Sequence, residues 1–230
     1  MIGRIDNRSR YELVYEQIKN EIINDAIKPG TKLNIQDLCD QLGISKTPVV
    51  TAINALERDG YVVVIPQNGT YVRELSQEET AALYDLRIAV EKLTLEYAVK
   101  NIDRAILSEI LENLKNLALC AQQADTDIID EYFRQEMSMH DYFLSCCPPL
   151  MQNIAKNVVD LTKRTRLLSL TCPAGLPDDD KWLIDDISMH ICIADAMLRG
   201  DLETAKQMTE RDIVDTKVRI LEILSKKEIL

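Results

Sequence analysis

The chain reads IQDLCDQLGISKTPVVTAINALERDGYVVVIPQNGTYVR between residues 35 and 73, and this stretch decides the fold of its N-terminal part. A first helix is expected over residues 35–42, and it ends at Gly43 because glycine suits the left-handed residue that closes a helix. Ser45 then caps a second helix, which Gly60 ends. The apolar residues of this second helix recur at spacings of four and three, which predicts one buried face: Val49, Ile53 and Leu56.

Two short strands are expected directly after these helices. Residues 61–65 (YVVVI) are rich in strand formers, residues 66–69 (PQNG) form a turn, and residues 70–73 (TYVR) return as a second strand. A helix-turn-helix followed by a hairpin is a winged helix. This module usually places its second helix in the major groove of DNA.

The composition is that of a globular protein with room for two domains. The chain has 230 residues, 46% of them hydrophobic, and no apolar run approaches the roughly 20 residues of a membrane span. The N-terminal residues lack the apolar core of a signal peptide, so we expect a cytoplasmic protein without membrane contact. The six cysteines show no Cys-x-x-Cys spacing and are expected to be reduced thiols: residues 39, 120, 146, 147, 172 and 192.

The net charge of −11 is concentrated in the second part of the chain. Residues 1–75 hold 9 Lys and Arg against 10 Asp and Glu, whereas residues 76–230 hold 18 against 28. The first part is therefore close to neutral. Because it offers few cations to DNA, tight binding would need two copies of the winged helix.

The second part is predicted to be an all-helical bundle. Ser76 with Glu79 three residues later is a capping box, which starts a helix almost directly after the wing. Caps, prolines and glycines divide the remainder into six expected helices, at about 77–101, 104–124, 127–146, 150–170, 180–199 and 201–227. The sequence thus predicts a mainly α protein with two domains, a winged helix-turn-helix over 1–75 and a bundle of about six helices over 76–230.

Several motifs carry a resemblance to a known family. In the first domain they are residues 27–33 (IKPGTKL), 42–49 (LGISKTPV) and 56–62 (LERDGYV); in the second they are residues 83–87 (LYDLR) with Glu91, and His190 followed by Ala194, Ala196, 200–201 (GD) and Ala205. With these motifs the chain resembles the GntR family of transcription regulators, in its FadR C-terminal-domain (FCD) subfamily. Six rather than seven bundle helices resemble the VanR-like branch.

The resemblance implies which residues meet operator DNA. The recognition helix of the family usually carries an arginine where this chain has Val50, and valine cannot hold a guanine by two hydrogen bonds. Operator preference is therefore expected to differ. The remaining DNA-binding candidates lie on the recognition helix and at the tip of the wing: Ser45, Lys46, Thr47, Thr51, Asn68 and Gly69.

The resemblance also implies a metal in the bundle. The corresponding ligands here are Glu136, His140, His190 and Asp212, and the spacing of four places the first two on one helix face. The only two histidines of the chain both fall on ligand positions. Two imidazoles and two carboxylates suit a divalent Zn, Mn, Ni or Fe ion. The alternative is a metal-free polar core in which the histidines pair with the acids.

Arg87 matches the family arginine that grips the carboxylate of an effector, a task that suits the guanidinium fork. The alternative is a salt bridge from Arg87 to Glu91 one turn later. Arg134, Tyr142 and Arg166 are further candidates to line the effector pocket. We therefore expect a homodimeric regulator, acting as a repressor, whose affinity for double-stranded operator DNA is controlled by a small carboxylate. A metal-ion sensor is the alternative, and an enzyme is not expected because no general base or nucleophile accompanies the site.

Overall fold

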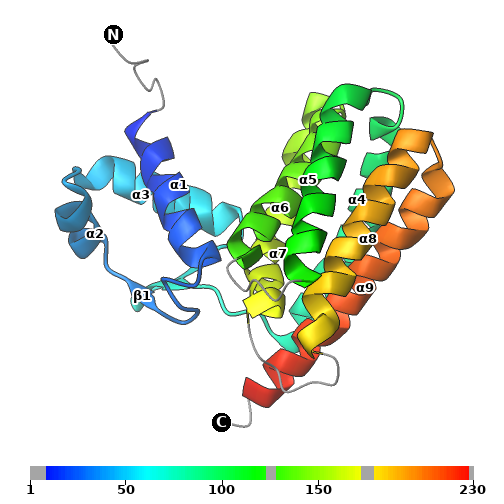
Figure 1. Cartoon of the computed structure of the whole chain (residues 1–230). Helices are drawn as coiled ribbons and strands as arrows, with labels where there is room; N and C mark the ends of the chain where they lie inside the picture. Colours follow the sequence, from blue (N-terminus) through cyan, green and yellow to red (C-terminus); the bar gives the residue numbers. More distant parts are fainter. Residues whose placement is uncertain (1–8, 123–127, 172–178, 228–230) are drawn as a thin grey trace. The chain divides into compact units, whose positions relative to one another are not determined.

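The computed structural model describes residues 9–122, 128–171 and 179–227. It separates into two compact units, Met1–Leu75 and Ser76–Leu230, which are described one at a time (Figure 1). The fold is mainly α-helical, with a winged helix-turn-helix followed by a helical bundle, as the sequence predicts. None of the helices in the described part of the chain is long and apolar enough to cross a membrane.

The N-terminal unit is the predicted winged helix with one additional strand. Its elements are α1 (Arg10–Ile23), β1 (Lys32–Leu33), α2 (Ile35–Leu42), α3 (Lys46–Arg58), β2 (Val62–Ile65) and β3 (Gly69–Val72). The three strands form an antiparallel sheet in the order β1-β3-β2. No sequence pattern predicts β1, because two residues are too few for an alternating pattern and the strand exists only by pairing with β3.

Local rules account for the ends of these helices. Gly43 closes α2 with φ +63°, as expected. Helix α1 ends at Ile23, and Asp25 two residues later adopts a left-handed φ of +59° that a helix cannot contain. Helix α1 packs against α3. The predicted face of α3 is fully buried, with Val49, Ile53 and Leu56 at no more than 2% exposure.

The C-terminal unit consists of six helices in its described residues: α4 (Gln77–Ala98), α5 (Arg104–Gln122), α6 (Ile129–Ser145), α7 (Pro149–Thr171), α8 (Asp179–Arg199) and α9 (Leu202–Lys227). The predicted capping box is present: the Ser76 hydroxyl accepts from the Glu79 amide, and the Glu79 carboxylate accepts from the Ser76 amide. Helix α4 packs against α9, α7 and α6, while α8 packs against α5, α9 and α6 (Figure 1).

The interior of this bundle has two different parts. One is apolar and lies around α5 and α8, with Leu107, Leu114 and Ile193 among its fully buried residues. The other is polar and collects charged side chains from α4, α6, α7, α8 and α9. Buried charges are costly unless they are paired or hold a ligand, so the polar part marks the candidate site.

Candidate functional site

Seven polar side chains form a buried cluster inside the C-terminal unit. We call this group the buried polar cluster; its members are Arg87 and Glu91 of α4, Glu136 and His140 of α6, Arg166 of α7, His190 of α8 and Asp212 of α9. Each is at most 7% exposed. Six of the seven were candidates from the sequence, and Glu91 had been considered only as a partner of Arg87.

His140 is held by one ring nitrogen and leaves the other unpaired. Its Nδ1 lies 2.6 Å from the Oε2 of Glu91. An ionised carboxylate can only accept, so Nδ1 carries a proton and donates it. The Nε2 is buried and has no hydrogen-bond partner among the described residues. His140 therefore presents the lone pair of Nε2 to the interior of the cluster.

His190 is arranged in the same way by different partners. Its Nδ1 lies 2.9 Å from the backbone carbonyl oxygen of Asp186, which can only accept, and 2.9 Å from the hydroxyl of Tyr132. Tyr132 donates to the Asp186 carboxylate at 2.6 Å. Burial and then the charge of Asp186 raise the pKa of Tyr132 well above its usual value, so this donor stays protonated. The Nε2 of His190 lies 3.5 Å from Oε1 of Glu136 and makes no hydrogen bond within the part of the chain that is described.

Glu136, His140 and His190 fit a divalent metal ion. One ligand atom from each lies within 4.8 Å of the others, and all three residues are buried. Two imidazole nitrogens fixed through their opposite ring nitrogens, with one carboxylate, are a donor set suited to Zn, Mn, Ni or Fe. Oε1 of Glu136 contacts the guanidinium of Arg166, but its Oε2 makes no hydrogen bond to any described residue.

Asp212 was the fourth ligand implied by the resemblance, but it does not join this donor set. Its Oδ1 lies 3.8 Å from Nδ1 of His190, on the side of the ring opposite the free Nε2. Asp212 instead groups with Asp186 and His190. Burial raises the pKa of Asp212 above its usual value, although His190 opposes the effect. As arranged here, Asp212 supports His190 from behind and does not face the other two ligands.

Arg87 is fully buried at 0% exposure and forms the ion pair that was the alternative reading of its motif. Its Nε donates to Oε1 of Glu91 at 2.5 Å. Burial by itself would raise the pKa of Glu91, but the charge of Arg87 and then the proton that Nδ1 of His140 directs at the carboxylate hold it well below the usual range. The ion pair uses only one edge of the guanidinium, because the Nη2 of Arg87 remains buried without a partner among the described residues.

Arg166 brings a second guanidinium to the cluster, as the sequence predicts. Its contact with Glu136 is joined by a weak contact from Nη1 to the sulfur of Met137 at 3.7 Å. Burial and the nearby charge of Arg87 lower the pKa of Arg166 to about 10. It therefore remains charged near neutral pH.

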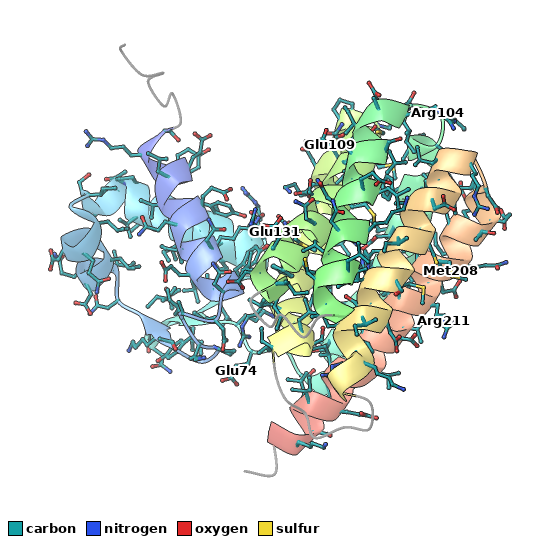
Figure 2. All side chains as sticks on the ribbon, viewed as in Figure 1. Glu74, Arg104, Glu109, Glu131, Met208 and Arg211 are labelled. Atoms are coloured by element: carbon teal, nitrogen blue, oxygen red, sulfur yellow. The ribbon has the colours of Figure 1, made fainter. Side chains whose placement is uncertain are left out.

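Arg134 and Tyr142 were expected to line the pocket but lie outside the cluster. The Arg134 side chain is 70% exposed and pairs with Glu131, which is labelled in Figure 2. The Tyr142 hydroxyl binds the backbone of Asp103 instead. Each residue is two positions away from a cluster member on α6, a rotation of about 200° around a helix, which explains why both point away.

The DNA-binding candidates all lie on accessible parts of the winged helix. Lys46, Thr47 and Thr51 are exposed on the first turns of α3, and Ser45 is the exposed N-cap. The hydroxyl of Thr51 donates to the backbone oxygen of Thr47 at 2.9 Å, which orients it. Asn54, exposed one turn beyond Val50, was not among the candidates.

The tip of the wing is shaped by Asn68 and Gly69. Asn68 accepts a hydrogen bond from the Tyr71 hydroxyl at 2.8 Å. Gly69 has φ +134°, a backbone conformation that L side chains rarely adopt, so glycine is favoured there. A Cβ at this position would lie 2.7 Å from Cε of Lys32, at the end of a flexible side chain. Lys32 thereby brings a cation beside the wing that the sequence did not place there.

Two residues that support the histidines were missed from the sequence, Asp186 and Tyr132. Asp186 precedes His190 by four residues, the same spacing that joins Glu136 to His140, so that signal was present. Tyr132 had no comparable signal. Its role depends on α6 and α8 packing together, which spacing within one helix cannot reveal.

Comparison with known proteins gives matches to both units. The family model described as bacterial regulatory proteins, gntR family, matches residues 10–72, and the FCD domain model matches residues 82–215. An uncharacterized HTH-type transcriptional regulator of Bacillus subtilis, YdhC, is 28% identical over 173 residues, covering 73% of this chain and 75% of that protein. The HTH-type transcriptional repressor RspR of Escherichia coli is 23% identical over 200 residues, 86% of this chain and 78% of its own.

Solved structures share the fold at low sequence identity. E. coli McbR/YncC superposes with a TM-score of 0.75 at 19% identity, covering 93% of this chain and 97% of that one. A GntR-type regulator from Rhodococcus sp. RHA1 has a TM-score of 0.72 at 20% identity, with 93% and 98% covered. These likenesses extend over both units. The relatives are transcription regulators, not enzymes.

Proposed function

This chain belongs to the GntR family of bacterial regulatory proteins, with an FCD domain, and is a DNA-binding transcription regulator; from this premise we propose that a small carboxylate, bound beside a divalent metal in the buried polar cluster, controls its affinity for operator DNA. The metal would be held by Glu136, His140 and His190. The carboxylate would be held by Arg87.

The observation that carries the proposal is the set of buried polar atoms that the described residues leave unpaired. Within the described part of the chain, four of them have no ion pair that would satisfy them: Nε2 of His140, Nε2 of His190, Oε2 of Glu136 and Nη2 of Arg87. The Nη2 of Arg166 also lacks a hydrogen bond among the described residues, but it contacts Oε1 of Glu136. An unpaired buried polar atom lowers the free energy of unfolding by roughly 1–3 kcal/mol. Four such atoms in one cluster would therefore destabilise the fold considerably unless a ligand satisfies them. Three of the four are metal donors, and the fourth donates to anions.

The charges of the cluster also suit a metal and an anion together. Three carboxyl groups face two guanidinium groups, those of Arg87 and Arg166. A divalent ion would leave the cluster positive whether or not Asp212 is ionised, and an anionic ligand would then restore the balance. A bound metal would act as a Lewis acid that attracts the carboxylate.

At the DNA end, we propose that Lys46, Thr47 and Thr51 of α3 face the major groove, together with Ser45 at the start of the helix. Asn68 and Gly69 would approach the adjacent backbone or groove. The exposure of these residues and the shape of the wing support this assignment. The same helix carries Val50 where the family usually has an arginine, so this position cannot recognise guanine by two hydrogen bonds.

We propose a homodimer that uses an apolar surface of α4 and α7. Residues 86, 90, 93 and 97 of α4 are apolar and are spaced by four, three and four, as in a helix–helix seam. On α7, Leu150 is 74% and Ile154 62% exposed. A groove between the two helices is lined by Val90, Leu93, Tyr97, Pro148, Leu150, Met151, Ile154 and Ala155. A second copy with the same surface would cover it, and two winged helices could then read an inverted repeat.

The test combines elemental analysis with operator titration. Protein purified without chelators should contain close to one divalent ion per chain. Operator DNA, selected from a random library, is then titrated by fluorescence anisotropy while a panel of small carboxylic acids is added, with and without the metal. The proposal expects a response that requires both metal and acid. An acid response of equal size in fully metal-stripped protein would refute the joint site.

A metal-ion sensor is the second candidate function. It is favoured by the donor set of Glu136, His140 and His190, which offers three ligand atoms without any organic ligand. In the same titration, a sensor would change its operator affinity with the metal alone, and added acids would have no further effect.

A further inference from the structure

We infer that Glu91 is a positioning residue that keeps the proton of the His140 ring on Nδ1, so that the lone pair of Nε2 stays available to a metal. This inference rests on the proposed metal site but concerns a residue outside its donor set. Glu91 would not touch the metal. It acts through His140.

The geometry assigns one carboxylate oxygen of Glu91 to each of two donors. Oε1 accepts from Nε of Arg87 at 2.5 Å, and Oε2 lies 2.6 Å from Nδ1 of His140. Glu91 is 6% exposed, so water does not compete for these bonds. The carboxylate thereby makes one short contact within α4, to Arg87, and one that joins α4 to α6, to His140.

Only a carboxylate can satisfy both partners while His140 keeps this tautomer. Arginine has no acceptor atom, so whatever faces Nε of Arg87 must accept. The group that faces Nδ1 of His140 must also accept if Nδ1 is to hold the proton. A carboxylate offers two acceptors at this separation, whereas an amide of the same shape offers one acceptor and one donor.

Glu91→Gln is therefore a specific test with nearly unchanged volume. The amide oxygen must turn to Arg87, which leaves the amide NH₂ facing Nδ1 of His140. Nδ1 then has to accept, the ring proton moves to Nε2, and the metal-binding lone pair is lost. His190 should be unaffected, because its Nδ1 is held by the Asp186 carbonyl and by Tyr132.

The experiment records long-range ¹H–¹⁵N spectra of the histidine rings in metal-free protein at pH 8. The chain has only two histidines, so one His140→Gln spectrum assigns both ring systems. The expected result is an Nδ1–H tautomer for both rings in the unaltered protein and an Nε2–H tautomer for His140 alone in Glu91→Gln. Glu109→Gln is the matched control, since it removes the same charge from an exposed position of α5 that is labelled in Figure 2.

Zn²⁺ affinity, measured by competition with a chelator, gives the second readout. Glu91→Gln should bind Zn²⁺ roughly 10- to 100-fold more weakly than the unaltered protein, as is usual when the support of a ligating histidine is removed. Glu109→Gln should bind it equally well.

Several outcomes would overturn the inference. One is an Nε2–H signal for His140 in the unaltered protein, a measurement that stands even if Glu91→Gln does not fold. Another is a Glu91→Gln protein whose His140 tautomer and Zn²⁺ affinity are both unchanged. If the unaltered protein binds no Zn²⁺, the proposed metal site is wrong, and the ring spectra alone then decide the role of Glu91.

Discussion

Replacing Arg87 by lysine tests the effector half of the proposed site with little damage to the fold. Alanine would be a poor choice, because it would leave Glu91 as an uncompensated buried charge and cost roughly 3–5 kcal/mol of unfolding free energy. Lysine keeps a positive charge beside Glu91. It removes the guanidinium edge whose Nη2 is buried and unpaired among the described residues.

The expected loss of effector affinity follows from the Nη2 nitrogen of Arg87. A hydrogen bond from Nη2 to an anionic oxygen contributes roughly 1.5–3 kcal/mol. Removal of this hydrogen bond should therefore weaken binding of the carboxylate effector by roughly 10- to 140-fold. Binding to operator DNA without effector should persist, because Arg87 belongs to the C-terminal unit and not to the winged helix.

The assay is the anisotropy titration of organic acids against operator-bound protein, with Arg134→Lys as control. Arg134 is an exposed arginine of the same unit, so its replacement should leave the response unchanged. If Arg87→Lys responds at the same acid concentration as the unaltered protein, Arg87 serves only its ion pair with Glu91. The reasoning from its free Nη2 would then be wrong.

Three further predictions concern the metal, the DNA and the dimer. His140→Ala should lose the divalent ion found by elemental analysis, and an unchanged ion content would exclude His140 as a ligand. If Lys46 contacts a base, Lys46→Ala should weaken operator binding by roughly 1–3 kcal/mol. If Lys46 contacts a phosphate, the same change should reduce the salt dependence of binding by about one ion. Gel-shift titrations at several salt concentrations distinguish these two outcomes from the absence of any contact. Leu93→Glu should weaken dimer association, measured by sedimentation, by roughly 10-fold or more. Leu119→Glu on α5 should not, although Leu119 is 58% exposed against 45% for Leu93.

Most of the fold could be predicted because its signals are local. Gly43, Ser76 and the spacing of Val49, Ile53 and Leu56 act through the conformation of a few neighbouring residues, and the structure confirms each. The six helices of the bundle follow from the same kind of signal. Strand β1 does not, since its two residues become a strand only by pairing with β3.

The sequence, with the resemblance it carries, predicted most of the chemical groups of the buried polar cluster, although it also assigned Arg134 and Tyr142 to the pocket. A spacing of four puts Glu136 and His140 on one face of α6, and the resemblance placed His190 and Arg87 with them. The structure brings these four residues together. Whether they bind a metal and an effector stays a prediction, which the experiments above address.

Only the tertiary structure decided how those groups face one another. Spacing fixes the face of a helix that a residue occupies, but not the rotation of that helix against its neighbours. For this reason Asp212 lies behind the ring of His190 instead of joining Glu136 and His140. The same cause makes Glu91 a bridge between α4 and α6, because the direction of its second oxygen depends on where α6 packs.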